Sequence, residues 1–247
     1  MLTYITIAIS VIFIIIGFLV TEENADLIAG YNAMSDEEKQ KFNLKGYIAF
    51  HRKFFLFLGI STLIGTLGAI YFFDEIVGTL FLIAYPILAS CYFTIKTSKF
   101  ENGKNRALKR IFILSILAII LGIFVWNFMN NLTEDKLICK AKEIEITGSY
   151  GEIVPKSEIK SIELVQKYPK LILKTNGFAV GNVKKGYFKT EKGEIVKLIV
   201  NSKWTPIILI TLKNDKKIYY SAENDSNKEL ASEIKEKLKM EQTKIGQ

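Results

Sequence analysis

Charged residues and histidine are absent from four long apolar stretches in the first half of the chain. These stretches cover residues 2–20, 54–73, 76–95 and 111–129. Each has about 20 residues, enough for a helix that crosses a hydrocarbon core roughly 30 Å thick. The pattern predicts four transmembrane helices within residues 1–130, and it excludes a water-soluble enzyme of ordinary design.

The first apolar stretch could also be a secretory signal peptide. However, residues 1–4 carry no positive side chain, and the apolar run is longer than the usual core of a signal peptide. Thr21-Glu22-Glu23-Asn24 follows it in place of a small-residue cleavage site. We therefore interpret this stretch as a retained helix.

Short alternating segments replace the long apolar stretches after residue 131. Seven of them have the alternation or composition of β-strands: 137–139, 144–147, 159–164, 171–173, 195–200, 207–212 and 218–220. Turn signals separate them: Thr147-Gly148, Tyr168-Pro169, Asn176-Gly177, Lys192-Gly193 and Asn214-Asp215.

A helix is expected after the last of these strands. It begins at a capping box, Ser226-Asn227-Lys228-Glu229, and carries an apolar stripe of Leu230, Ile234 and Leu238. Many short antiparallel strands followed by one amphipathic helix are typical of a partly open β-barrel or sandwich capped by that helix. We expect this domain over residues 135–240, followed by a flexible tail at 241–247.

Two parts of the chain resemble known families. The C-terminal part resembles a bacterial pleckstrin-homology-like domain through Tyr150-Gly151-Glu152-Ile153, residues 159–162, Thr175-Asn176-Gly177, Gly181, Gly186-Tyr187-Phe188, residues 206–210 and Tyr219. The membrane half resembles a family known as domain of unknown function 3784 through residues 27–35, LIAGYNAMS. These resemblances imply a bacterial membrane protein with a pleckstrin-homology-like fold, and they carry no catalytic residue.

Lysine and arginine in the connecting segments predict the orientation in the membrane. The first segment carries five, Lys39, Lys41, Lys45, Arg52 and Lys53, whereas the Asp74-Glu75 hairpin carries none. The third carries six: Lys96, Lys99, Lys104, Arg106, Lys109 and Arg110. Because short basic loops stay in the cytoplasm and large domains translocate largely regardless of charge, we expect both termini and the C-terminal domain outside the cytoplasm.

The sequence offers little chemistry for catalysis. His51 is the only histidine, Cys91 and Cys139 are the only cysteines, and these residues lack the spacing of a metal site. There is no glycine-rich nucleotide motif, and the four apolar stretches contain no charge that would mark a transport path. We therefore expect no catalytic, cofactor-binding or metal residue.

Residues in the first connecting segment are candidates for contact with a partner or with lipid. Tyr31, Asn32 and Met34 follow a turn-prone glycine and precede a capping box at Ser35. The helix after Ser35 would lie near the lipid surface. A purely structural cap on the helical bundle is an equal alternative.

Residues 182–189 form the second candidate contact. Lys184, Lys185, Tyr187 and Lys189 combine bases with an aromatic ring and suit lipid phosphates or a polyanionic wall polymer. The alternative is a solvated hairpin edge, where lysines discourage strand-to-strand aggregation.

The sequence thus favours a non-enzymatic membrane protein of the bacterial envelope. Its outer domain is expected to bind a protein, a peptide or an envelope component, in envelope stress or in protection against antimicrobial peptides. Nucleic acid is not expected as a partner because the domain lies across the membrane from it. The alternative function is a small transporter or an accessory subunit of a membrane enzyme complex; the oligomeric state is not indicated.

Overall fold

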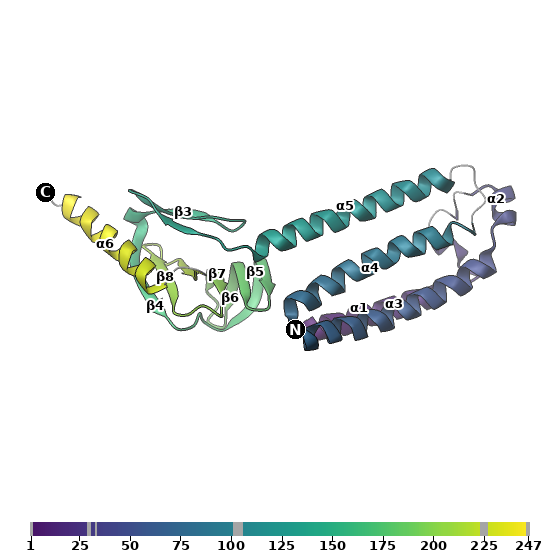
Figure 1. The fold of residues 1–247 in the computed structure, drawn as a ribbon, viewed down its shortest axis with the longest axis horizontal. Helices are drawn as coiled ribbons and strands as arrows, with labels where there is room; N and C mark the ends of the chain where they lie inside the picture. Colours follow the sequence, from purple (N-terminus) through teal and green to yellow (C-terminus); the bar gives the residue numbers. More distant parts are fainter. Residues whose placement is uncertain (1, 29–30, 33, 101–105, 223–226, 246–247) are drawn as a thin grey trace. The chain divides into compact units, whose positions relative to one another are not determined.

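The computed structural model describes residues 2–28, 31–32, 34–100, 106–222 and 227–245. The chain divides into two compact units, Met1–Val125 and Trp126–Gln247. Figure 1 shows helices in the first unit and two sheets with a final helix in the second.

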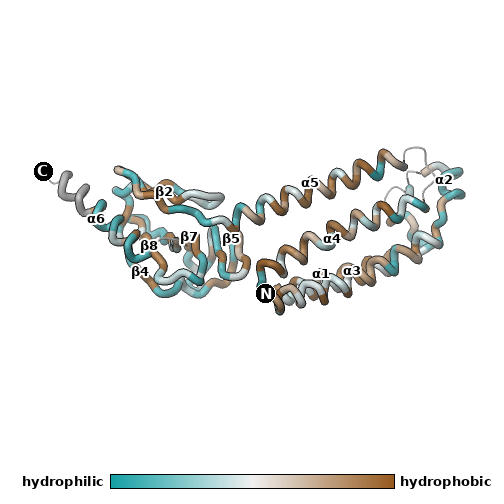
Figure 2. Tube along the Cα trace, in the orientation of Figure 1, coloured by the Kyte–Doolittle hydropathy of each residue, from teal (hydrophilic) through white to brown (hydrophobic). Residues whose placement is uncertain are grey.

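Four helices are long and apolar enough to cross a membrane: α1 (Leu2–Leu19), α3 (Leu44–Phe72), α4 (Glu75–Thr97) and α5 (Arg106–Leu132). The predicted transmembrane helices are therefore confirmed, and Figure 2 shows apolar residues along their length. The helix α3 begins ten residues before the predicted stretch at 54, because its first turns include His51, Arg52 and Lys53. The last residues of α5 belong to the second unit.

Small residues allow α1 and α3 to pack closely. A Cβ atom on Gly59 of α3 would lie 2.7 Å from the Ser10 carbonyl oxygen of α1, and one on Gly17 of α1 would lie 3.1 Å from Phe55 Cβ. Thr6 and Ser10 of α1 and Thr62 and Thr66 of α3 are buried. This close approach of small side chains is typical of helix pairs in membranes.

The connections between these helices follow the predicted signals. Asp74 Oδ1 accepts a hydrogen bond from the Val77 amide at 2.9 Å, which caps α4 directly after α3. The first connection contains η1 (Ala25–Leu27) and α2 (Asp36–Lys41). The predicted capping box is formed, because the Ser35 hydroxyl accepts from the Glu38 amide while Glu38 Oε2 accepts from the Ser35 amide.

The second unit contains two sheets and a helix. The strands β1 (Leu137–Cys139), β2 (Glu143–Ile146) and β3 (Glu152–Pro155) form an antiparallel three-stranded sheet in the order β1-β2-β3. After η2 (Lys156–Glu158), six strands form the second sheet: β4 (Ile159–Val165), β5 (Leu171–Val180), β6 (Val183–Thr190), β7 (Ile195–Asn201), β8 (Ile207–Leu212) and β9 (Lys217–Tyr220). Their order is β4-β8-β9-β7-β6-β5, and α6 (Asn227–Ile245) follows.

The six-stranded sheet is open, with β4 and β5 as its edges in the described residues, which agrees with the expected partly open arrangement. Two other expectations are corrected in this unit. The pair β7 and β9 is parallel, because β9 inserts between β7 and β8, whereas an antiparallel arrangement was expected throughout. The strands β3 and β6 are absent from the predicted set of seven.

The predicted turn at Asn176-Gly177 is also wrong. Both residues lie inside β5, where Gly177 is opposite Gly186 of β6. A Cβ atom on Gly177 would lie 2.3 Å from the Lys185 carbonyl oxygen. The absence of a side chain at this position therefore allows β5 and β6 to approach closely. The turn occurs instead at Gly181, with φ 55°, while the predicted turns at Gly148, Gly193 and Asp215 are confirmed by positive φ angles.

Two hydrophobic cores lie on the two faces of the six-stranded sheet. One face, which we call the lysine face, carries Lys185, Lys197, Ile199, Ile208, Ile210 and Ile218, as the strand registers show. Its isoleucines form one core with Ile144, Ile146 and Val154 of the three-stranded sheet and with Ala231 and Ile234 of α6. On the opposite face, a second core contains Phe188, Val196, Leu198, Val200, Ile207 and Tyr219.

The predicted C-terminal helix is confirmed as α6. It lies along β4 and β8, and Leu230, Ile234 and Leu238 pack into the core of the lysine face. The expected cap residue Ser226 lies outside the described residues. The helix continues to Ile245, past the expected start of a tail at 241.

Candidate functional site

Two neighbouring strands place lysines and apolar side chains side by side on the lysine face. On β6, Lys185, Tyr187 and Lys189 alternate with residues of the opposite face. On β7, Lys197 is the register partner of Tyr187, and Ile195 is the partner of Lys189. Because side chains alternate along a strand and register partners share a face, these residues lie on one surface.

Only part of this surface is covered. The three-stranded sheet and α6 bury Ile199, Ile208 and Ile218. Beyond this cover, Tyr187 is 39% exposed and Ile195 is 60% exposed. Leu173 of β5, the register partner of Lys189, is 57% exposed. Three large apolar side chains thus remain open to solvent beside lysines.

A cavity of about 280 Å³ lies between the covered and the open parts. We call it the lysine-face pocket. Its lining comes from β3, β6, β7, β8, β9 and the turn before β9: Glu152, Tyr187, Ile195, Lys197, Leu212, Lys216, Lys217 and Ile218. Three lysines, one carboxylate and several apolar groups therefore face one space.

The charges of the pocket are only partly compensated. Lys197 Nζ lies 2.7 Å from Glu152 Oε2 and 5.3 Å from the centre of the Tyr187 ring. Lys217 Nζ lies 2.8 Å from Glu194 Oε2, and this hydrogen bond raises the pKa of Lys217, so the ion pair persists at neutral pH. Lys216 makes no ion pair within the described part of the chain. The pocket therefore carries excess positive charge.

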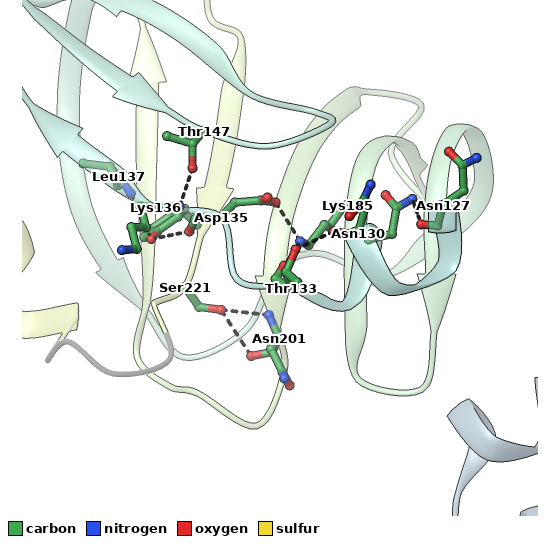
Figure 3. Close-up of polar contacts among 12 residues, drawn as sticks. Asn127, Asn130, Thr133, Asp135, Lys136, Leu137, Thr147, Lys185, Asn201 and Ser221 are labelled. Atoms are coloured by element: carbon green, nitrogen blue, oxygen red, sulfur yellow. Dashed lines mark hydrogen bonds and ion pairs between the residues drawn. The ribbon is translucent and has the colours of Figure 1, made fainter. Parts of the chain in front are cut away.

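A second polar cluster joins the end of α5 to the six-stranded sheet (Figure 3). Lys185 Nζ lies 2.9 Å from Asp135 Oδ2 and also donates to the Thr133 carbonyl oxygen. The Tyr220 hydroxyl donates to the Asp135 carbonyl oxygen at 2.8 Å and accepts from the Leu137 amide at 3.1 Å. The chain after α5 is thus held at several points.

Burial dominates the electrostatics of this cluster. The side chains of Lys185 and Asp135 are only 6% and 3% exposed. Burial raises the pKa of Asp135, while the hydrogen bond and charge of Lys185 act in the opposite direction. Gly148, with φ 93°, packs against the carboxylate, and a Cβ atom there would overlap Asp135 Oδ1. This cluster is closed to solvent and is structural.

The predicted contact residues of β6 therefore differ in the sheet face on which they lie and in their burial. Tyr187 lines the pocket, and Lys189 is exposed on the same face. Lys184 is on the opposite face, where its Nζ lies 5.6 Å from the centre of the Tyr168 ring. The solvated hairpin edge is wrong for Lys185, because β6 lies between β5 and β7 and the side chain is buried.

Two of the predicted contact residues of the first connection pack on a hydrophobic cluster within the first unit. Tyr31 and Met34 pack on a cluster that includes Phe42 and Phe100, with the Tyr31 and Phe42 ring centres 5.5 Å apart. Asn32 is exposed, and its Nδ2 donates to the Asp26 carbonyl oxygen at 3.4 Å. These contacts fit a cap on the helices, and contact of this segment with a partner or with lipid stays a prediction.

Several pocket residues are missed by sequence reasoning. Glu152, Lys197 and Lys216 come from three separate segments that only the tertiary fold brings together. One local signal exists, because Lys197 interrupts the apolar run of residues 195–200. In the described ranges, no three His, Cys, Asp or Glu side chains are placed to hold a metal ion.

The fold and its surfaces define a multi-pass membrane protein with a β-rich C-terminal region. Residues 7–101 match the family model described as Domain of unknown function (DUF3784). The match covers most of α1 and all of α3 and α4, and it confirms the resemblance of the membrane half. The resemblance of the C-terminal region to a pleckstrin-homology-like domain lies outside the match and stays a prediction. No curated protein and no solved structure matches the chain.

Proposed function

We propose that this chain is a membrane-anchored, non-enzymatic protein that binds an anionic peptide or envelope component in the lysine-face pocket. The observation that supports the proposal is the pocket itself, in which exposed Tyr187 and Ile195 adjoin Lys197, Lys216 and Lys217. Apolar side chains beside a few oriented charged groups are typical of binding sites.

The charges favour an acidic ligand. Glu152 compensates Lys197 and Glu194 compensates Lys217, so the charge of Lys216 is left for a ligand. A carboxylate or phosphate group would gain a charge-assisted hydrogen bond there. Tyr187, Ile195 and Leu212 would then contact an adjoining apolar group.

The size favours a short segment of a larger ligand. The cavity of about 280 Å³ is slightly smaller than the range of roughly 300–1,000 Å³ for small-molecule sites. It suits one or two side chains of a peptide. Because the lysines would repel a cationic peptide, protection against cationic antimicrobial peptides is poorly supported, and a role with an acidic envelope partner fits better.

We also propose that the C-terminal region lies outside the cytoplasm of a bacterial cell. The lysine and arginine residues of the three connecting segments, five, none and six in number, support this orientation. Cysteines introduced at Asn214 and at Lys99, with Cys91 and Cys139 replaced by alanine, test it in whole cells. An impermeant maleimide is expected to label Asn214→Cys and not Lys99→Cys; the reverse pattern would refute the orientation.

Peptide binding tests the pocket directly. Fluorescent peptides that combine Phe or Leu with Glu or Asp are titrated against the full chain in detergent, beside peptides with Lys in place of the acids. The acidic peptides are expected to bind at least tenfold more tightly. Equal binding of both sets, or no binding of either, would refute the proposal.

Two variants with the same charge change locate the binding. Lys216→Glu lies in the pocket, whereas Lys174→Glu alters an exposed lysine on the opposite face of the sheet. Lys216→Glu is expected to weaken binding of the acidic peptides at least tenfold, and Lys174→Glu less than twofold. A similar loss in both variants would mean that binding is not in the pocket.

A further inference from the structure

The end of α5 follows an apolar stretch that is long enough to cross a membrane. The apolar stretch of this helix ends at Met129, and Asn130 and Asn131 follow before the helix ends at Leu132. The three residues of the helix after Met129 span about 4.5 Å at 1.5 Å per residue. This length is close to the thickness of one headgroup layer, roughly 5–8 Å on each side of the hydrocarbon core.

The β5–β6 hairpin lies directly beside this part of the helix. The rings of Phe128 on α5 and Phe178 on β5 have their centres 5.8 Å apart. Lys185 of β6 donates to the Thr133 carbonyl oxygen just after the helix. A small cavity is lined by Leu132, Val183 and Trp204 together. The hairpin is therefore at the depth of the helix end.

A second loop joins this hairpin at the same end of the sheet. The Ser202 amide donates to the Asn182 carbonyl oxygen at 2.9 Å, and the Ser202 hydroxyl contacts the Asn182 side chain at 3.1 Å. The residues 178–184 and 201–206 thus form one surface next to the end of α5. We call it the helix-end surface.

The composition of the helix-end surface suits a lipid interface. Trp204 and Phe178 are half-buried and Lys203 is exposed, while Lys184 is half-buried near Tyr168. Tryptophan and other aromatic rings favour the headgroup level of a bilayer. Lysines close to a membrane surface are attracted to anionic lipids.

We infer that the helix-end surface rests on the headgroup layer of the membrane that α5 crosses, and that anionic phospholipid is its partner. Trp204 and Phe178 enter the interface, and Lys184 and Lys203 face lipid phosphates. The inference is independent of the lysine-face pocket, whose ligand it leaves unchanged.

Tryptophan fluorescence of the full chain in lipid nanodiscs tests the inference. The chain has two tryptophans, so Trp126→Phe leaves Trp204 as the single probe. The control probe is Lys192→Trp in a background with Trp126→Phe and Trp204→Phe. Residue 192 follows the opposite end of β6, about 26 Å from the hairpin for eight residues at roughly 3.3 Å each.

The nanodiscs contain phosphatidylcholine with or without phosphatidylglycerol, and a nitroxide on the lipid headgroup serves as quencher. Trp204 is expected to be quenched at least twofold more strongly than the control probe. Equal quenching of the two probes would refute the placement of the surface at the membrane. A blue-shifted Trp204 emission relative to the control would support it.

Charge reversal tests the identity of the lipid. Lys184→Glu with Lys203→Glu is expected to reduce Trp204 quenching at least twofold in phosphatidylglycerol nanodiscs and much less in pure phosphatidylcholine. Lys189→Glu with Lys192→Glu has the same charge change at the other end of β6 and is expected to leave quenching unchanged. Quenching that depends on neither charge nor lipid would refute anionic lipid as the partner.

Discussion

Two buried lysines on neighbouring strands of one sheet face meet their carboxylate partners in different surroundings. The side chains of Lys185 and Lys197 are 6% and 5% exposed. Asp135, the partner of Lys185, is 3% exposed, whereas Glu152, the partner of Lys197, is 34% exposed. One pair is sealed and holds the chain after α5 to the sheet. In the other pair, Glu152 is partly exposed and both residues line the pocket. The exposure of the carboxylate therefore distinguishes a pair with a structural role from a pair at a binding surface.

The largest effect on stability is expected from Lys185→Ala. The change leaves Asp135 as a buried carboxylate without its cation, which costs about 3–5 kcal/mol. Pulse proteolysis of the full chain in detergent, with increasing urea, measures this loss for the C-terminal region. Lys189→Ala, an exposed lysine on the same strand, is the control and is expected to change stability by less than about 0.5 kcal/mol. Equal stability of the two variants would contradict a structural role for the sealed pair.

A smaller loss is expected from Lys197→Ala. Water can hydrate the half-buried Glu152 carboxylate when its partner is removed, so the cost is about 1–2 kcal/mol, mainly lost packing and the cation–π contact with Tyr187. The same proteolysis assay measures it. A loss as large as that of Lys185→Ala would remove the distinction between the two pairs.

Lowering the pH is expected to reduce the stability loss of Lys185→Ala but not that of Lys197→Ala. Burial raises the pKa of Asp135, so the folded state retains its proton to a higher pH than the unfolded state. The contribution of this group to the free energy of unfolding therefore grows as the pH falls through the folded pKa. Without Lys185, which lowers this pKa, the effect is larger, and the defect of Lys185→Ala shrinks by about 1 kcal/mol between pH 7.5 and pH 5.

The control for this pH dependence is Lys197→Ala, whose difference from the unmodified chain is expected to stay constant. Glu194 and Asp215 have their pKa values lowered by hydrogen bonds from Lys217 and Lys160. The stability that these two carboxylates contribute decreases as the pH is lowered. Because this decrease is the same in every variant, it cancels when the free energies of unfolding of two variants are subtracted. If acid relieved both variants equally, the pH effect would not come from Asp135.

The smallest effect on stability is expected in the open part of the face. Ile195→Glu is expected to change stability by less than about 0.5 kcal/mol, because the side chain is already exposed. The same change is expected to abolish binding of acidic peptides by charge repulsion. Ile153→Glu, at a similarly exposed isoleucine of the three-stranded sheet, should leave binding intact. A marked loss of stability in Ile195→Glu would place Ile195 in the core.

The membrane helices were predictable because their signal is local. An uncharged stretch of about 20 residues needs no knowledge of its neighbours to be identified as a membrane span. The start of α3 at Leu44 was not predictable in this way, because a helix can continue through Arg52 and Lys53 once it leaves the hydrocarbon core. The capping box at Ser35 was a local signal as well, and it is formed.

The sheets were harder to predict because their pairing is not local. Gly177 resembles a turn residue in sequence, yet it lies within β5 because Gly186 is opposite it. The same limit applies to the pocket. Tyr187 was identified from its own segment, but Glu152 and Lys197 are 45 residues apart in the chain. Only the charge of Lys197 inside an apolar strand signalled its special position.

The position of β9 has a consequence for the synthesis of this protein. Because β9 lies between β7 and β8, the strands β5, β6 and β7 on one side and β4 and β8 on the other have no direct pairing in the sheet order until residues 217–220 arrive. Long-range pairing of this kind is slow. The nascent C-terminal region therefore stays incomplete until residues 217–220 have left the ribosome, and a chain that stops before Lys217 would present unpaired strand edges to chaperones and proteases.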